Sequence, residues 1–451
     1  MSFKSAYLQR VYDKVLQRNP GETEFLQAVK EVLESFEPVV AKRPDLEKNG
    51  IMERIVEPER FISFRVSWVD DNNVVQVNRG YRVQFNSAIG PYKGGLRFHP
   101  SVNASIIKFL GFEQCFKNSL TGLPIGGGKG GSDFDPRQKS DGEIMRFCQS
   151  FMTELYRHIG PNVDVPAGDI GVGGREIGYL YGQYKRIRGA WENGVLTGKG
   201  QSYGGSVIRP EATGYGAVYF AKRVLELHNE DIKGKTFSVS GFGNVAWGAV
   251  LKINELGGKV LTISGPDGYI YDKDGVTTEK AAYMLEMRNS GRDKVQDYAD
   301  KFGVEFFAGK KPWGVKVDVA MPCATQNEIG LVEAQSIIDN GVKFYIEVAN
   351  MPTTNEAMAL LLENNVVCAP SKAVNAGGVS VSALEMSQNS MRYSWTEKEV
   401  DDKLKSIMDN IFDVSLSAAR EYGFGDNLMM GANIAGFLKI ADAMTAQGIA
   451  Y

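Results

Sequence analysis

Three lysines in the first third of the chain stand where they could bind anions or move protons. Lys93 lies in PYKGGLRF, Lys117 in GFEQCFKNSL and Lys129 in PIGGGKGG. Gln114 shares a face with Lys117, because residues three apart on a helix are neighbours. A group of cations suits a small substrate with two carboxylates, and burial with mutual repulsion would lower a lysine pKa enough for proton transfer near neutral pH. The alternative for any single lysine is a solvated surface charge.

Asp169 is the carboxylate that could balance these cations and carry protons. It follows Gly168 in NVDVPAGDIGVGGRE, and further glycines come after it. An aspartate among glycines is also typical of a turn in which the carboxylate accepts hydrogen bonds from its own backbone. The sequence therefore leaves two interpretations of Asp169, a proton carrier or a turn residue.

A glycine-rich turn in the second half has the form of a dinucleotide-binding fingerprint. It follows the strand pattern TFSVS and opens a helix pattern. In such a turn the first glycine allows a tight bend, the second lets the backbone approach a pyrophosphate, and the third small residue lets the helix pack on the strand. The alternative is an ordinary glycine-rich turn between a strand and a helix. The fingerprint residues are Gly241, Phe242, Gly243, Asn244, Val245 and Ala246.

The residues that follow the fingerprint favour NAD over NADP. An acidic residue about 20 positions on usually binds the adenosine ribose. Ser264 or Gly265 stands at that position, and Asp267 comes slightly later in SGPDG. No arginine or lysine stands there to bind a 2′-phosphate, although a loop from elsewhere could supply one. We therefore expect Asp267 to bind the cofactor, with NADP as the alternative to NAD.

Polar side chains of the second half precede a predicted helix, as Thr213 does, or follow strand patterns. Thr213 stands in RPEATGYG, Asn350 in EVAN, Asn375 in SKAVNAGG and Ser382 in VSVS. Ligands in open α/β sheets bind beyond the carboxyl ends of the strands. These side chains are therefore candidate nicotinamide and ribose contacts, and helix capping by threonine and asparagine is the alternative.

The patterns along the chain predict an α/β protein with two domains and a helical tail. Residues 61–69 and 74–85 are strand-like with a DDNN turn between them, and helices are expected near 102–118 and 213–228. Short apolar strands then alternate with helices, which indicates a Rossmann-like, doubly wound parallel sheet. We expect a substrate-binding and oligomerisation domain at 1–204, a dinucleotide-binding domain at 205–378, and a helical segment at 379–451 that returns to the first domain.

Composition excludes several classes of function. The 451 residues carry a net charge of −3, which gives no electrostatic case for binding nucleic acid or an anionic membrane. No apolar run reaches membrane-spanning length, and the N-terminus does not have the pattern of a signal peptide. Four separated cysteines and three histidines exclude the usual zinc spacings, so no metal is expected. Reduced thiols in a cytoplasm are the default expectation.

Long motifs over nearly the whole chain resemble the hexameric bacterial-type glutamate dehydrogenases of the Glu/Leu/Phe/Val dehydrogenase family. The resemblance implies a homohexamer that interconverts L-glutamate with 2-oxoglutarate and ammonium, using NAD or NADP. The motifs are GYRVQFNSAIGPYKGGLRFHPSV, LGFEQCFKNSLTGLPIGGGKGGSDFDP, FMTELYRHIGPNVDVPAGDIGVGGREIGY, GGSVIRPEATGYG, SGFGNVAWGA, MPCATQNEI, YIEVANMPTT and SKAVNAGGVSVSALEMSQN.

The same resemblance implies a role for each matched residue. Lys93 and Ser382 would hold the side-chain carboxylate, and Lys117, Gln114 and the Gly168 backbone would hold the α-carboxylate. Lys129 would activate the water that adds to the imine, and Asp169 would move protons to and from the amino nitrogen. Thr213 and Asn375 would bind the nicotinamide amide, with Asn244 near the phosphates. Phe242 and SGPDG resemble the NAD-preferring members.

Two alternatives remain beside glutamate dehydrogenase. One is a relative that acts on apolar amino acids, but such relatives lack the lysine that meets the side-chain carboxylate, and Lys93 is present. The other is a nucleotide-binding scaffold without catalysis. It would lack Lys129 or Asp169, and both stand in intact motifs.

Overall fold

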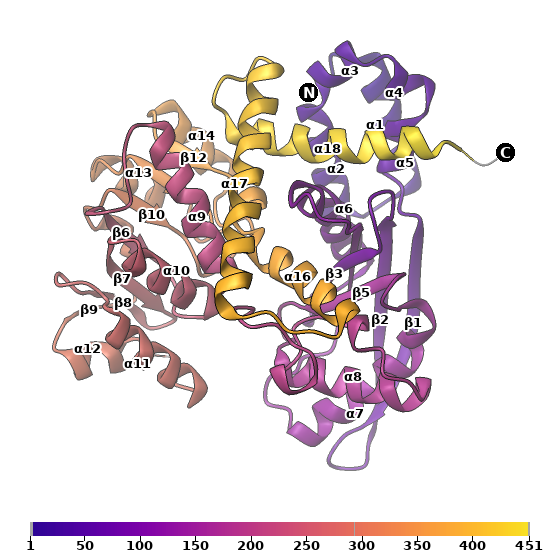
Figure 1. Cartoon of the computed structure of the whole chain (residues 1–451), viewed down its shortest axis with the longest axis horizontal. Coiled ribbons are helices and arrows are strands. Elements are labelled where there is room, and N and C mark those ends of the chain that lie inside the picture. The colour runs from indigo at the N-terminus through magenta and orange to yellow at the C-terminus, as the bar shows by residue number, and fades with distance from the viewer. Residues whose placement is uncertain (1–2, 293, 450–451) are drawn as a thin grey trace.

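The computed structural model describes residues 3–292 and 294–449, which form two lobes (Figure 1). Each lobe is built around one β-sheet, the first from residues 60–168 and the second from residues 236–369. The predicted fold class, an α/β protein with two sheet-containing parts, is therefore confirmed.

The first lobe holds the predicted antiparallel hairpin and a set of helices at the N-terminus. Its elements are α1 (Ala6–Arg18), α2 (Thr23–Ser35), α3 (Glu37–Lys42), α4 (Asp45–Lys48), α5 (Ile51–Ile55), β1 (Arg60–Val69), β2 (Val75–Asn86), β3 (Tyr92–Phe98), α6 (Ala104–Leu120), β4 (Gly127–Ser132), α7 (Asp141–Leu155), η1 (Tyr156–His158), β5 (Asp164–Gly168), α8 (Gly174–Arg188), η2 (Asn193–Val195) and η3 (Gln201–Tyr203). The strand order is β1-β2-β4-β3-β5, with β3 parallel to β4 and β5.

Three strands of the first sheet contain glycine and are not predicted by the sequence patterns. These strands, β3, β4 and β5, read YKGGLRF, GGKGGS and DVPAG and show no apolar alternation. A Cβ on Gly94 would lie 1.7 Å from the carbonyl oxygen of Gly128. A Cβ on Gly127 would lie 2.2 Å from Sγ of Cys115 on α6. Glycine stands at these positions because the backbone approaches its neighbours too closely for a side chain.

The second lobe has a seven-stranded sheet in the order β12-β11-β10-β6-β7-β8-β9. Its elements are α9 (Ala212–Leu227), β6 (Thr236–Val239), α10 (Asn244–Glu255), β7 (Lys259–Gly265), β8 (Gly268–Tyr271), α11 (Thr278–Asn289), α12 (Gln296–Phe302), β9 (Glu305–Ala308), η4 (Pro312–Gly314), β10 (Val319–Met321), α13 (Leu331–Asp339), β11 (Phe344–Ile346), α14 (Asn355–Glu363), β12 (Val367–Ala369) and α15 (Ser371–Val374).

This sheet is mixed, whereas the sequence predicts a parallel one. Strands β12, β11, β10, β6 and β7 are parallel, but β8 and β9 pair antiparallel at one edge. Only Pro266 and Asp267 separate β7 from β8. A parallel connection needs about a dozen residues, so a two-residue link forces a hairpin.

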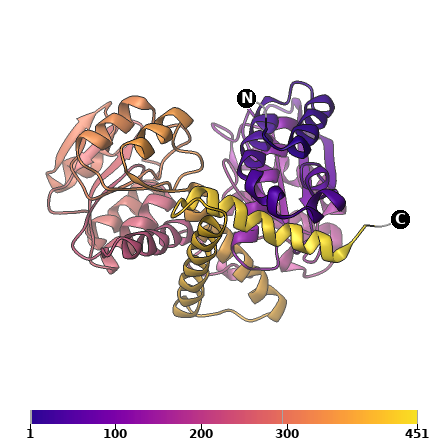
Figure 2. The same cartoon turned by 90° about the horizontal axis from the view of Figure 1, so that it is seen from above.

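The C-terminal helices return to the first lobe, as predicted. They are α16 (Gly377–Met391), α17 (Glu397–Glu421) and α18 (Leu428–Gln447). In Figures 1 and 2, α17 lies between the lobes and α18 crosses the N-terminal helices. Phe437 of α18 stacks on Phe36 with 4.1 Å between ring centroids, inside the core of the first lobe. This helix therefore ties the end of the chain to its beginning.

Two helices begin at capping boxes. Ser140 and Glu143 cap α7, and Thr396 and Glu399 cap α17, each with both reciprocal hydrogen bonds. Within residues 3–292 and 294–449, none of the helices is long and apolar enough to cross a membrane.

Candidate active site

A cleft of about 780 Å³ lies where the two lobes face each other. The first lobe contributes residues of β3, β4 and α6 and the residues after β5. The second lobe contributes the start of α9 and α10 and the loops after β10, β11 and β12, and α16 completes the wall. The cleft brings together eleven of the predicted site residues: Lys93, Gln114, Lys117, Lys129, Gly168, Asp169, Thr213, Val245, Asn350, Asn375 and Ser382.

Asp169 directly follows the carboxyl end of β5, and its carboxylate contacts two cations. Its Oδ2 lies 3.3 Å from Nζ of Lys129 and 2.8 Å from Nε of Arg97. Burial alone would raise the pKa of the carboxyl, but the charges of Lys129 and Arg97 and their hydrogen bonds lower it to about 2. Burial lowers the pKa of Lys129, and Asp169 opposes that shift. The pair is therefore an acid and a base held in contact and shielded from water.

Lys117 and Gln114 line the cleft from α6. Burial, with repulsion from Lys129, lowers the pKa of Lys117 to about 8. Nε2 of Gln114 donates to Oδ1 of Asn118 at 2.6 Å, which fixes the amide. The ammonium groups of Lys117 and Lys129 thus lie close enough to repel each other, and an anion bound between them would relieve that repulsion.

A second cationic region of the cleft, apart from Lys117 and Lys129, contains Lys93, Arg209 and Ser382. Lys93 is buried at 1% exposure, and its Nζ donates to the carbonyl oxygen of Val165 at 3.1 Å and to Oγ1 of Thr197 at 2.8 Å. Oγ of Ser382 accepts from Nε of Arg209 at 3.0 Å. Burial and the charge of Arg209 lower the pKa of Lys93 well below its ordinary value. Two cations and a hydroxyl therefore line this end of the cleft, a combination that suits an anion.

The fingerprint adopts the geometry of a dinucleotide turn. Gly241 has a φ of +81°, and its N–H donates to Oγ of Ser264 at 2.8 Å. Gly243 is the N-cap of α10, and Ala246 is fully buried where that helix meets the core. Asn244 accepts a hydrogen bond from the guanidinium of Arg288. The free N–H groups of a helix start and an arginine thus lie together, which suits phosphate groups.

Asn375 and Thr213 offer polar groups to a planar amide. Nδ2 of Asn375 donates to Oδ1 of Asn350 at 2.8 Å, but Oδ1 of Asn375 is buried and has no partner within the described residues. A Cβ on Gly378 would lie 2.6 Å from Oγ1 of Thr213, so only glycine leaves room for that hydroxyl. An orphaned buried oxygen fits the amide nitrogen of a nicotinamide, because such an atom is costly to leave unpaired. The residues present therefore fit a dinucleotide cofactor.

The structure does not bring Asp267 into the cleft. Its two carboxylate oxygens accept from the backbone N–H groups of Val295 and Gln296, each at 3.0 Å, at the start of α12. Its part in cofactor binding stays a prediction. Gly241, Phe242, Gly243, Asn244 and Ala246 also lie outside the cleft lining, in or beside the turn that leads to it.

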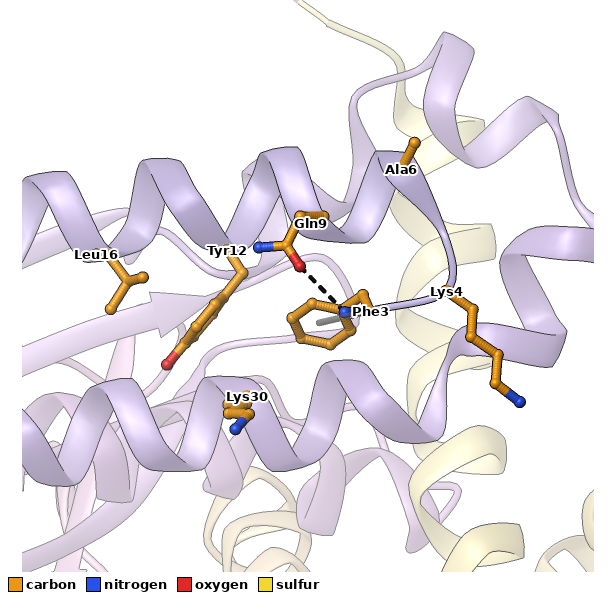
Figure 3. A pocket seen from close by; sticks show the side chains of 7 residues that line it. All are labelled: Phe3, Lys4, Ala6, Gln9, Tyr12, Leu16 and Lys30. Atoms are coloured by element: carbon orange, nitrogen blue, oxygen red, sulfur yellow. Dashed lines mark hydrogen bonds between the residues drawn. The ribbon is translucent and has the colours of Figure 1, made fainter. Parts of the chain in front are cut away.

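A second hollow lies far from this chemistry, between α1 and α2 (Figure 3). Its lining includes Tyr12 and Leu16 of α1, Lys30 of α2, and Phe3, which comes before α1 and lies between the two helices. It contains none of the predicted site residues.

Four site residues were not singled out by sequence reasoning. Arg97 stands in the quoted motif KGGLRF and Arg209 in RPEATGYG, so both carried a signal. Thr197 and Arg288 carried none, because each meets its partner only through the fold: Thr197 bonds Lys93 from 104 residues away.

The fold and the cleft define a dinucleotide-dependent oxidoreductase with an anion-binding substrate site. Comparison with known families identifies the family of oxidoreductases to which the chain belongs. The chain belongs to the Glutamate/Leucine/Phenylalanine/Valine dehydrogenase family: residues 204–448 match the model of that name, and residues 58–186 match the Glu/Leu/Phe/Val dehydrogenase dimerisation domain. The resemblance inferred from the sequence motifs is confirmed.

Individual relatives match over the full chain. The sequence is 66% identical over 449 residues to the NAD-specific glutamate dehydrogenase of Clostridium symbiosum, covering 99% of this chain and 100% of that protein. It is 55% identical over 451 residues to the NADP-specific glutamate dehydrogenase of Haemophilus influenzae, covering 99% of each. A solved glutamate dehydrogenase structure superposes with a TM-score of 0.97 at 65% identity, covering 99% of this chain and 100% of that one.

Proposed function

We propose that the chain is a glutamate dehydrogenase that converts L-glutamate reversibly to 2-oxoglutarate and ammonium with NAD. One observation carries the proposal: a single cleft holds two sets of buried cations, Lys93 with Arg209 and Lys117 with Lys129, opposite a dinucleotide turn. A substrate with two carboxylates matches two cationic ends, whereas an amino acid with an apolar side chain would leave Lys93 and Arg209 buried without an anion.

The substrate is held at both ends. Lys93 and Ser382 bind the side-chain carboxylate, since Lys93 has three N–H donors and uses two of them on Val165 and Thr197. Lys117, with Gln114 and the Gly168 backbone, binds the α-carboxylate. The α-carbon then lies between the two ends, on the side of the cleft that carries Lys129 and Asp169.

Lys129 and Asp169 move the protons. Lys129 takes a proton from the water that adds to the imine carbon, which a lysine can do near neutral pH when burial lowers its pKa. Asp169 is an ionised carboxylate in contact with Lys129, so it receives that proton from Lys129 and passes it to the amino nitrogen. Lys129, neutral again, then takes the remaining hydroxyl proton as the carbonyl forms and ammonia leaves. Closing the cleft would exclude bulk water from this exchange.

The second lobe holds the cofactor. When bound, NAD accepts the hydride from the α-carbon of glutamate. Asn375 and Thr213 bind its amide, with Asn350 orienting Asn375 through the 2.8 Å hydrogen bond. The other cofactor contacts are Gly241, Phe242, Gly243, Asn244, Val245, Ala246 and Asp267. The NAD-specific relative at 66% identity, against 55% for the NADP-specific one, supports NAD.

Further proposals concern organisation. We infer domains at 1–204, 205–378 and 379–451, supported by the separation of the two sheets at residues 60–168 and 236–369. We infer a homohexamer in the cytoplasm. An oligomer is supported by the edge strand β1 and by four exposed valines around the β1–β2 turn. They are Val69, Val74, Val75 and Val77.

The first test is the initial rate of reductive amination with 2-oxoglutarate and ammonium, run in parallel with NADH and NADPH. We expect turnover with a strong preference for NADH. A preference for NADPH would keep the enzyme and overturn the cofactor assignment. No rate with either cofactor would overturn the function, and a screen of other oxo acids would then separate an apolar substrate from an inactive scaffold.

The role of Lys93 has its own test. Lys93→Leu should raise the KM for glutamate and improve the reaction with L-norvaline, which has the same length and no side-chain carboxylate. An unchanged KM for glutamate would show that Lys93 does not anchor the side chain.

A further inference from the structure

A fully buried ion pair lies behind the cationic end of the cleft and takes no part in the roles above. Nζ of Lys199 lies 2.7 Å from Oε1 of Glu385, and both side chains have 0% exposure. Lys199 belongs to the segment between η2 and α9, and Glu385 lies on α16. Burying two charges costs desolvation, so such a pair needs good geometry and further hydrogen bonds to be tolerated.

The pair is the centre of a wider polar contact between α16 and this segment. The Glu385 carboxylate also accepts from the backbone N–H groups of Gly198 at 3.0 Å and of Lys199 at 3.4 Å. The remaining bonds are Lys199 Nζ to Asn389 Oδ1 at 3.0 Å, Asn389 Nδ2 to the Gly204 carbonyl oxygen at 2.6 Å and Gln388 Nε2 to Ser206 Oγ at 2.9 Å. One face of α16 thus holds residues 198–206 along their length.

The same two elements carry the groups that orient Lys93 and bind its anion. Two residues before Lys199, the buried Thr197 accepts from Nζ of Lys93 at 2.8 Å. One helical turn before Glu385, Ser382 accepts from Nε of Arg209 at 3.0 Å. The direction of the third N–H of Lys93 relative to Ser382 therefore depends on how the segment is fixed to α16.

The negative charge of Glu385 also links the ion pair to Lys93 and Arg209. Burial lowers the pKa of Lys93 and of Arg209, and the negative charge of Glu385 opposes the shift at both. Glu385 therefore lies near enough to help both groups stay cationic.

We propose that the Lys199–Glu385 ion pair positions the site for the substrate's side-chain carboxylate, by fastening residues 197–199 to α16 so that Lys93 and Ser382 face the same anion. The proposal rests on the glutamate dehydrogenase function proposed above. Glu385 and Lys199 are positioning residues, because neither lines the cleft.

The experiment compares Glu385→Gln with the wild-type chain in glutamate oxidation. We expect the KM for glutamate to rise about tenfold or more, with kcat within threefold and the KM for NAD within twofold. A tenfold change corresponds to about 1.4 kcal/mol, a typical value for a charge-assisted hydrogen bond that is lost or misaligned. The matched control is Lys252→Met, which breaks another buried lysine pair, to Asp401 at 2.9 Å, away from the cleft. It should lower thermal stability and leave the KM for glutamate unchanged.

Three results would overturn the proposal. In Glu385→Gln, they are an unchanged KM for glutamate, an equal rise of the KM values for glutamate and NAD, or a loss confined to kcat or stability. If Glu385→Gln does not fold, the variant Lys199→Met/Glu385→Gln buries no charge and replaces the test, because neutral replacement of a buried pair is often tolerated. A folded double variant with the wild-type KM would equally overturn it. Since the wild-type chain is assayed beside each variant, failure of the function itself is seen separately, as absent wild-type turnover.

Discussion

Replacing Asp169 by asparagine keeps the shape of the side chain and removes its charge. In the wild-type protein its Oδ2 lies 3.3 Å from Nζ of Lys129 and 2.8 Å from Nε of Arg97. Asp169→Asn would leave both cations facing a neutral amide at the carboxyl end of β5. The substitution therefore asks whether this carboxylate keeps Lys129 protonated and carries protons itself.

The magnitude follows from the geometry. At an effective dielectric constant of about 20, unit charges 3.3 Å apart attract each other by roughly 5 kcal/mol. This attraction favours the charged form of Lys129 and opposes the effect of burial. We therefore expect the pKa of Lys129 to fall when the charge of Asp169 is removed, in the same direction as the shift that burial causes.

Two assays read out the change. The pH midpoint for labelling Lys129 with a small amine-directed reagent, followed by mass spectrometry, should move to lower pH, because the neutral amine is the reactive form. The kcat for reductive amination should fall by at least about 100-fold, since a positioned acid or base contributes about 10²–10⁴-fold. Binding of NADH, measured by fluorescence titration, should change by less than about threefold, because the cofactor-binding residues lie in the other lobe.

The matched control is Asp272→Asn, which neutralises another buried carboxylate, 2.6 Å from Nζ of Lys280 in the second lobe. It should lower stability and leave kcat unchanged. If Asp169→Asn kept kcat within threefold and left the labelling midpoint in place, Asp169 would be a turn residue and the proton path would have to be assigned elsewhere.

Three further predictions concern single groups. Burial lowers the pKa of Lys117 to about 8, so its cation is lost above that pH and kcat/KM for 2-oxoglutarate should fall about tenfold per pH unit there. The variant Lys117→Arg should remove this fall. A wild-type profile that stays flat to pH 10 would contradict the prediction. Asn375→Leu should raise the KM for NADH up to about tenfold, the value of one hydrogen bond, with the KM for 2-oxoglutarate unchanged; an unaltered KM for NADH would exclude Asn375 from the cofactor site. A Cβ on residue 94 would lie 1.7 Å from the Gly128 carbonyl oxygen, so Gly94→Ala should lower the free energy of unfolding, measured by chemical denaturation, by about 1–3 kcal/mol. If the variant were as stable as the wild-type protein, the two strands could move apart at no cost.

Local patterns predicted the elements that are held together by near neighbours in sequence. The hairpin at β1 and β2 and the capped helices α7 and α17 all carry their signal within a few residues. The strands β3, β4 and β5 do not, because the groups that leave no room for side chains at their glycines belong to other strands and to α6. Side-chain alternation is the usual sign of a strand, and a strand that must approach its neighbours closely has no side chains to show it.

The candidate site likewise contains residues that local motifs identify and residues that they do not. Lys129 and Lys93 could be found because glycines flank them, and the fingerprint because its spacing is local. Arg97 meets Asp169 across 72 residues, and Glu385 meets Lys199 across 186. Their partners are chosen by the fold, so no spacing in the chain reports them.

The cleft carries a charge opposite to that of the whole molecule. The chain has a net charge of −3, yet six cationic side chains and two carboxylates line the cleft. Burial lowers the pKa of Lys93, Lys117 and Lys129, which means that the fold holds these cations at a cost in free energy. Any ligand that brings two carboxylates offsets part of this cost at both ends of the cleft. Under the proposed function, the two carboxylates of the substrate bind where the buried cations cost the most free energy, so the charges that destabilise the fold also select a dicarboxylate. The cations are Lys93, Arg97, Lys117, Lys129, Arg209 and Lys372, and the carboxylates are Glu113 and Asp169.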